Sequence, residues 1–128
     1  MELSAHISNS GSSLEKTDNG YRRSYIFKES FPGFDGHFPG NPILPGVIQT
    51  MLGQISAEEA LAIEFPGEKL VLQTVTRCKF LRPVKPLEKL ELSFSIKTKA
   101  LKHIAVCSLS VAGDTAATYQ LIFTTEGI

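Results

Sequence analysis

The segment between residues 31 and 46 limits the possible folds of this chain more than any other. It holds four prolines and four glycines. Proline fixes φ and lacks a backbone N–H, so neither a helix nor a central strand can run through such a segment. We therefore predict a shaped loop between a strand over residues 21–28 and a helix that begins after Pro45, where the missing N–H costs nothing.

Residues 47–62 predict a single helix. They contain no proline and one glycine, and their apolar positions recur largely at helical spacing. Because apolar side chains occupy much of the circumference, we expect the helix to be substantially buried. Phe65-Pro66-Gly67 ends it.

The rest of the chain has the pattern of four strands, over residues 69–81, 89–99, 103–112 and 115–125, separated by turns. In the second of them, Leu90, Leu92, Phe94 and Ile96 alternate with polar residues, as in a strand with one buried face. One helix against such a sheet implies an antiparallel sheet wrapped around it, an α+β architecture. We expect one domain over residues 1–128, in which residues 1–20, rich in Ser, Asn and Gly from residue 8 onward, form a loose lead-in.

The composition argues against several classes of function. Thirteen Lys and Arg residues balance thirteen Asp and Glu residues, so the long-range field of a general nucleic-acid or anionic-membrane binder is missing. The two cysteines, Cys78 and Cys107, give little support to a disulfide scaffold or a zinc site. No apolar run approaches the ~18 residues of a membrane span. We expect a reduced, cytoplasmic protein without a metal or a tightly bound cofactor.

One motif is specific, since residues 36–47 read GHFPGNPILPGV. This segment resembles the loop-to-helix signature of the hot-dog-fold 3-hydroxyacyl-acyl-carrier-protein dehydratases. Residues 72–84, which include RCKFLRPV, are similar to the strand and turn that follow the helix in that family. The resemblance implies a hot-dog fold and a dehydratase-like function on acyl thioesters of fatty-acid or polyketide-type metabolism.

Dehydration of a 3-hydroxyacyl thioester needs a base, a donor to the enolate-like oxygen and an acid for the departing hydroxide. The resemblance makes His37 the base, and a free imidazole titrates near ~6.5, which suits that role; a purely structural loop histidine is the alternative. The N–H of Gly46, at the positive end of the helix, matches the family's donor to the thioester carbonyl. For the acyl tunnel we assign Phe38, Val47, Thr50, Met51 and Phe80.

The acid is missing from its expected position. In the family a Glu or Asp stands fourteen residues after the catalytic His, and here that residue is Met51. A one-residue shift of the helix places Thr50 there, which cannot replace a strong acid, and a thioether donates no proton. Glu58 and Glu59 begin roughly 10 Å further along the helix. Asp35 precedes His37, where no family role transfers.

The densest basic stretch consists of Arg77, Lys79, Arg82 and Lys85. A regular strand points Arg77 and Lys79 the same way, toward an acidic carrier protein, and turns Cys78 and Phe80 inward. A solvated sheet face is the alternative for these charges. The resemblance also implies an acyl carrier protein or acyl-CoA thioester as substrate, and a homodimer or a heterodimer with a related hot-dog chain, because family sites lie between two subunits.

Three functions remain open at this point. The first is a 3-hydroxyacyl-acyl-carrier-protein dehydratase with His37 as base and an unidentified acid. The second is a non-catalytic acyl-carrier-protein-binding or partner subunit, completed only by a chain that contributes the carboxylate. The third is a hot-dog thioesterase, in which His37 and the helix start bind the thioester while water attacks it. Members of that last class usually use a helix carboxylate as well.

Overall fold

The computed structural model describes residues 3–34 and 40–125. Its strands are β1 (Glu15–Thr17), β2 (Gly20–Ile26), β3 (Leu70–Phe80), β4 (Lys89–Lys99), β5 (Lys102–Val111) and β6 (Asp114–Thr125). Its helices are α1 (Leu3–Ser10) and α2 (Gly46–Glu64), with one 3-10 turn, η1 (Pro32–Phe34). Neither α1 nor α2 is both long and apolar enough to cross a membrane.

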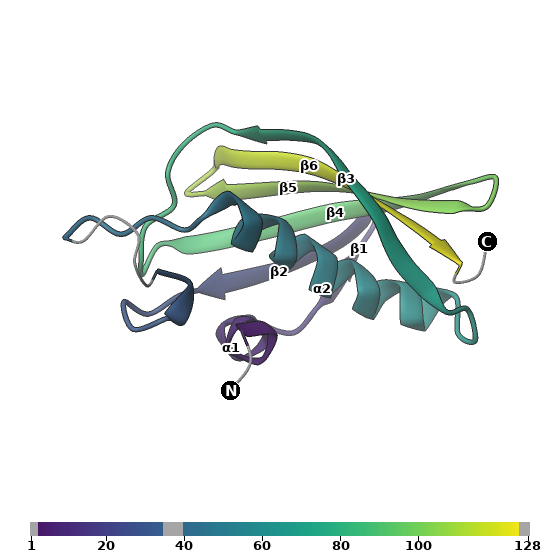
Figure 1. Cartoon of the computed structure of the whole chain (residues 1–128), viewed down its shortest axis with the longest axis horizontal. Helices are drawn as coiled ribbons and strands as arrows, with labels where there is room; N and C mark the ends of the chain where they lie inside the picture. Colours follow the sequence, from purple (N-terminus) through teal and green to yellow (C-terminus); the bar gives the residue numbers. More distant parts are fainter. Residues whose placement is uncertain (1–2, 35–39, 126–128) are drawn as a thin grey trace.

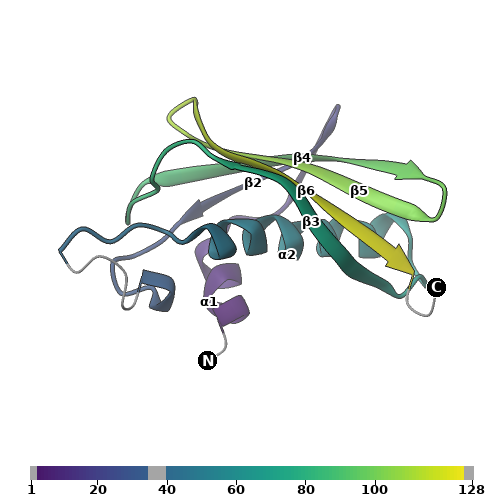
Figure 2. The same cartoon turned by 45° about the horizontal axis from the view of Figure 1, so that its top comes forward.

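The six strands form one curved sheet that wraps around α2 (Figure 1). Their order is β1-β2-β4-β5-β6-β3, and every neighbouring pair is antiparallel. Figure 2 shows α2 along the inner side of the sheet, with α1 against α2. The predicted α+β hot-dog architecture is therefore confirmed, and the predicted central helix needs only one further residue at its start and two at its end.

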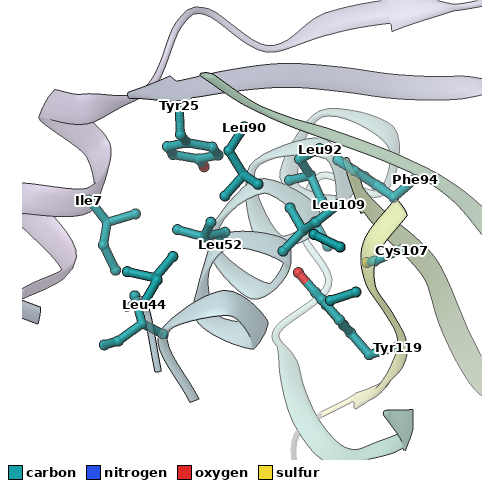
Figure 3. Packing of buried hydrophobic residues seen from close by; sticks show 14 of the residues in the cluster. Ile7, Tyr25, Leu44, Leu52, Leu90, Leu92, Phe94, Cys107, Leu109 and Tyr119 are labelled. Atoms are coloured by element: carbon teal, nitrogen blue, oxygen red, sulfur yellow. The ribbon is translucent and has the colours of Figure 1, made fainter. Parts of the chain in front are cut away.

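The core lies between α2 and alternate residues of the central strands. Leu52 of α2 is fully buried, as are Leu90 and Leu92 of β4 and Leu109 of β5. Figure 3 shows these side chains gathered around the helix. Burying one leucine stabilises a fold by ~1.5–3 kcal/mol, so this cluster holds α2 firmly on the sheet. The position of the first turn of α2 follows from that packing.

The first 20 residues are more ordered than a loose lead-in, and that prediction is wrong for two segments. α1 forms there, and its Ile7 is fully buried in the same core cluster as Leu52. β1 pairs with β2, with Thr17 opposite Gly20. Turn-forming Ser and Asn residues surround Ile7, the buried residue of α1, and they concealed the helix, which Leu3 also helps to pack against the core.

The strand β3 lies at the edge of the sheet and is irregular. Its register against β6 shifts twice, between Leu72 and Thr74 and between Thr76 and Lys79. Arg77, inside the second shift, has a φ of 55°. A bulge breaks the alternation of a strand, and the prediction that Cys78 packs inward is wrong, because this residue is exposed. Phe80 is 48% exposed, but its ring lies against Gly46 of the helix, as predicted.

Candidate functional site

A pocket of about 480 Å³ lies where α2 begins. Its lining comes from the loop before the helix, the first turn of the helix and the end of β3 with the turn that follows. The lining residues are Ile43, Leu44, Pro45, Gly46, Gln49, Phe80, Leu81, Arg82 and Pro83. Most of these side chains are apolar, and a few polar groups converge among them, as in pockets that bind small organic ligands.

The helix start supplies hydrogen-bond donors to this region. Pro45 is the N-cap, and its carbonyl accepts the N–H groups of Ile48 and Gln49, both at 3.1 Å. The N–H groups of Gly46 and Val47 have no acceptor among the described residues. Unpaired N–H groups at the positive end of a helix stabilise a partial negative charge. The backbone is therefore suited to polarise a carbonyl oxygen.

Gly46 lies directly against the ring of Phe80. A Cβ atom added at Gly46 would lie 2.9 Å from Cζ of Phe80, closer than carbon atoms pack. A glycine at this position therefore lets the ring close over the helix start. Gly46, predicted from the sequence to bind the thioester carbonyl, therefore contacts Phe80, predicted to line the acyl tunnel.

Gln49 is the polar residue of the first helical turn, and it is 3% exposed. Its Nε2 donates a hydrogen bond to the carbonyl of Leu44 at 3.0 Å, and the N–H of Leu44 donates to the carbonyl of Val84 at 2.8 Å. Its Oε1 is buried and has no partner among the described residues. From the sequence, Gln49 is indicated only as a group that could bind or orient water where the acid is missing, and it is not assigned to the site. A polar residue on the buried face of a helix could have indicated it.

The hydroxyl of Tyr119, on β6, bridges two backbone groups of α2. The N–H of Gly53 donates to the hydroxyl of Tyr119 at 3.1 Å, and the hydroxyl donates to the carbonyl of Gln49 at 2.7 Å. Figure 3 shows the hydroxyl end of Tyr119 pointing toward α2. Burial raises the pKa of Tyr119 well above its ordinary value, so the phenol remains a neutral donor.

Two of the predicted site residues, His37 and Phe38, lie outside the described residues. Val47 is 67% exposed, and the hydroxyl of Thr50 donates to its carbonyl at 2.9 Å. Met51 packs against the core cluster and is only partly buried. Val47, Thr50 and Met51 do not belong to the described lining of the pocket at the start of α2. Their place in an acyl tunnel stays a prediction.

The four basic residues do not gather at this pocket. Arg82 lines it and forms an ion pair with Glu88 at 2.8 Å. Arg77 and Lys79 line a separate groove of about 630 Å³ that also includes the β1–β2 turn. Lys85 is exposed, and its backbone N–H donates to Glu88 at 2.7 Å. Docking of a carrier protein on these residues stays a prediction.

Acidic side chains are missing from the described part of the pocket lining. Glu59 forms an ion pair with Arg23 at 2.5 Å, and Glu58 accepts a hydrogen bond from Gln54 at 3.4 Å. Both glutamates are exposed and lie beyond the first turns of α2. The described groups can therefore bind a thioester carbonyl and an apolar chain, but none of them is placed to protonate a leaving hydroxide.

Comparison with known sequences identifies the group to which this chain is related. The profile of the ApeI-like family, described as ApeI dehydratase, matches residues 13–119. The 3-hydroxyacyl-[acyl-carrier-protein] dehydratase FabZ of a Thermoanaerobacter species is 36% identical over 101 residues, which are 75% of this chain and 71% of that protein. The FabZ of Levilactobacillus brevis is 31% identical over 118 residues, 90% of this chain and 75% of that protein.

Solved structures show the same fold at lower sequence identity. The dehydratase heterocomplex ApeI:P from Xenorhabdus doucetiae matches with a TM-score of 0.71 and 23% identity, covering 89% of this chain and 96% of that one. The thioesterase yhdA from Lactococcus lactis matches with a TM-score of 0.78 and 12% identity, covering 98% of each chain. Structural likeness at such identities establishes the fold alone, whereas the sequence matches extend over most of the chain. The chain therefore belongs to the ApeI-like family of hot-dog dehydratases.

Proposed function

We propose that this chain binds a 3-hydroxyacyl thioester at the start of α2 and acts as the base-bearing subunit of a dehydratase. The observation that carries the proposal is the pocket in which unpaired helix N–H groups meet an apolar lining without a described carboxylate. The N–H of Gly46 binds the thioester carbonyl, and His37 removes the proton on carbon 2. The two relatives compared above, both 3-hydroxyacyl-[acyl-carrier-protein] dehydratases FabZ, support an acyl carrier protein as the carrier of the substrate.

The reaction proceeds by elimination. As His37 takes the proton, negative charge develops on the carbonyl oxygen, where the helix start stabilises it. The electron pair then forms the second bond of the double bond between carbons 2 and 3 as the bond from carbon 3 to its oxygen breaks, and the oxygen leaves as water once an acid protonates it. General acid help is worth ~10²–10⁴-fold, so this chain by itself is expected to turn over slowly.

A second hot-dog chain supplies the acid in this proposal. The edge strand β3 supports such pairing, because Val71, Val75 and Phe80 expose apolar surface beside an unpaired strand edge. The Xenorhabdus relative supports it as well, since that structure is a heterocomplex. A partner with a Glu or Asp on its own helix would complete a site that contains His37.

The test is a mixed-subunit assay on a 3-hydroxyacyl-acyl-carrier protein, with products identified by mass spectrometry. The partner is a FabZ relative that keeps its helix carboxylate but has its own motif histidine changed to alanine. Each protein by itself should be nearly inactive, the mixture should form the enoyl product, and His37→Ala should abolish that gain. Fast turnover by this chain without a partner, undiminished by His37→Ala, would refute the proposal. Release of a free acid instead of an enoyl product would assign the chain to the thioesterases.

A further inference from the structure

We infer that Gln49 is a specificity-determining residue, whose Oε1 accepts a hydrogen bond from the hydroxyl on carbon 3 of the bound acyl chain. The inference rests on the proposed function, because it assumes that a thioester occupies the pocket at the start of α2. The inference specifies which class of acyl thioester the site prefers. Thioesters with a donor on carbon 3 are bound more tightly than saturated ones.

Within the described part of the chain, the amide oxygen of Gln49 is unpaired. Gln49 lines the pocket, is 3% exposed, and leaves Oε1 without a partner among the described residues. A buried acceptor that stays unpaired is costly. A ligand that offers a donor removes this cost, whereas a saturated chain leaves the oxygen unpaired and also excludes water from it.

The side chain of Gln49 points back toward the start of α2. Helical side chains lean toward the N-terminus of their helix, and Nε2 of Gln49 reaches back to the carbonyl of Leu44, 3.0 Å away. The amide therefore lies beside the helix start. Gly46 is one turn before Gln49, and residues three apart are neighbours on a helix, with Cβ positions ~5–6 Å apart. The carbonyl on carbon 1 and the hydroxyl on carbon 3 are separated by a single carbon atom, so one ligand can present them to neighbouring positions of the helix.

The groups around Gln49 determine which atom of its side-chain amide can bind the ligand. The carbonyl of Leu44 can only accept, so it selects Nε2 and leaves Oε1 for the ligand. The hydroxyl of Tyr119 holds the backbone carbonyl of the same residue at 2.7 Å. Gln49 is thus held at both its side chain and its main chain. Because Oε1 can only accept a hydrogen bond, the site must prefer ligands that carry a donor on carbon 3. A 3-methoxy ligand keeps the oxygen but cannot donate, so it should bind as poorly as a saturated chain.

The experiment measures binding of three pantetheine thioesters to the full-length chain by calorimetry: hexanoyl, 3-hydroxyhexanoyl and 3-methoxyhexanoyl. Mass spectrometry after each titration checks that the ligand is intact. We expect the 3-hydroxy compound to bind about 5- to 10-fold more tightly than the other two, the scale of one hydrogen bond. Equal binding of all three would overturn the role of Gln49 and leave thioester binding in place. No binding of any of them would refute the proposed function itself.

Two variants test whether the side chain of Gln49 causes the preference for the 3-hydroxy compound. Gln49→Met keeps the length of the side chain but lacks the acceptor, so the preference for the 3-hydroxy compound should disappear while hexanoyl binding persists. Gln54→Met is the matched control, because Gln54 lies on the same helix outside the described pocket lining and its side chain donates to the exposed Glu58. It should keep the full preference. A preference that survives in correctly folded Gln49→Met would reject the assignment, and the 3-methoxy comparison on the unmodified chain tests it even if that variant does not fold.

Discussion

The hydroxyl of Tyr119 on β6 donates a hydrogen bond to the backbone carbonyl of Gln49 on α2, over 2.7 Å. The contact ties the inner face of the sheet to the helical turn that carries the candidate site. The same hydroxyl also accepts a hydrogen bond from the N–H of Gly53, one turn further along α2. The first turn of α2 is therefore positioned by the sheet as well as by its own backbone.

Replacing the hydroxyl of Tyr119 should affect both the stability and the site. Tyr119→Phe leaves the carbonyl of Gln49 and the N–H of Gly53 buried beside a ring edge, so the free energy of unfolding should fall by about 1–3 kcal/mol. Chemical denaturation would measure the loss, and thioester binding should weaken as well. Tyr25→Phe is the matched control, because its hydroxyl bonds to Ser56 further along α2 at 3.0 Å. Equal effects of the two variants on binding would contradict a positioning role for Tyr119.

Two glycines of α2 should respond oppositely to alanine. At Gly53 a Cβ would lie 2.5 Å from the buried hydroxyl of Tyr119, whereas at Gly46 it would meet the half-exposed ring of Phe80. The first clash cannot relax, so Gly53→Ala should destabilise the fold by ~1–3 kcal/mol, although alanine favours helices by ~1 kcal/mol. Gly46→Ala should leave the melting temperature nearly unchanged and weaken thioester binding. A stabilised Gly53→Ala protein would show that the hydroxyl of Tyr119 does not occupy this space.

The chain should lose stability at alkaline pH. Burial raises the pKa of the Cys107 thiol from 9.0 to about 12, so between these values the unfolded chain has released a proton that the folded chain retains. The free energy of unfolding must then decrease as pH rises, by at most about 1.4 kcal/mol per pH unit for this group. Urea unfolding in unit steps from pH 9 to 12 would measure the slope. Burial also raises the pKa values of Tyr119 and Tyr21, so part of the slope remains without the thiol. Cys107→Ala should reduce the slope, and the exposed Cys78→Ala should not; the same slope in both variants would exclude Cys107 as a source.

The sequence was sufficient for the elements whose patterns are local. Alternation in β4 and the helical spacing after Pro45 predicted both elements to within two residues. The bulge around Arg77 was not predictable from alternation, because it depends on the pairing of β3 with β6. α1 was missed because only Ile7 and the partly buried Leu3 anchor it, among residues typical of turns.

The candidate site, like the fold, was predictable from the sequence only where its residues belong to a local motif. Gly46 was found because its motif is contiguous in sequence. Gln49 and Tyr119 are seventy positions apart, and only the folded sheet brings the hydroxyl of one to the carbonyl of the other. An unpaired amide oxygen is also invisible in a sequence, since it is defined by what surrounds it. Local motifs therefore located the site, and tertiary contacts revealed the residue proposed to determine its specificity.

The last prediction restores the missing acid. Met51 stands where the family has a Glu or Asp, and it is partly buried at the edge of the core. Met51→Glu should raise dehydration of a 3-hydroxyacyl-acyl-carrier protein by up to ~10²–10⁴-fold, because partial burial favours the protonated carboxyl that donation requires. Formation of the enoyl product, followed by mass spectrometry, measures the gain.

Two further variants decide what such a gain means. Met51→Gln has nearly the shape of the glutamate but no acidic proton, so its activity should stay at the level of the unmodified chain. Adding His37→Ala to Met51→Glu should remove the gain, because the acid acts on a substrate whose proton the histidine must take. A folded Met51→Glu protein that binds the thioester but gains no activity would show that the two groups do not meet in a site built from copies of this chain. The carboxylate would then have to come from a different chain, and the mixed-subunit assay tests that arrangement directly.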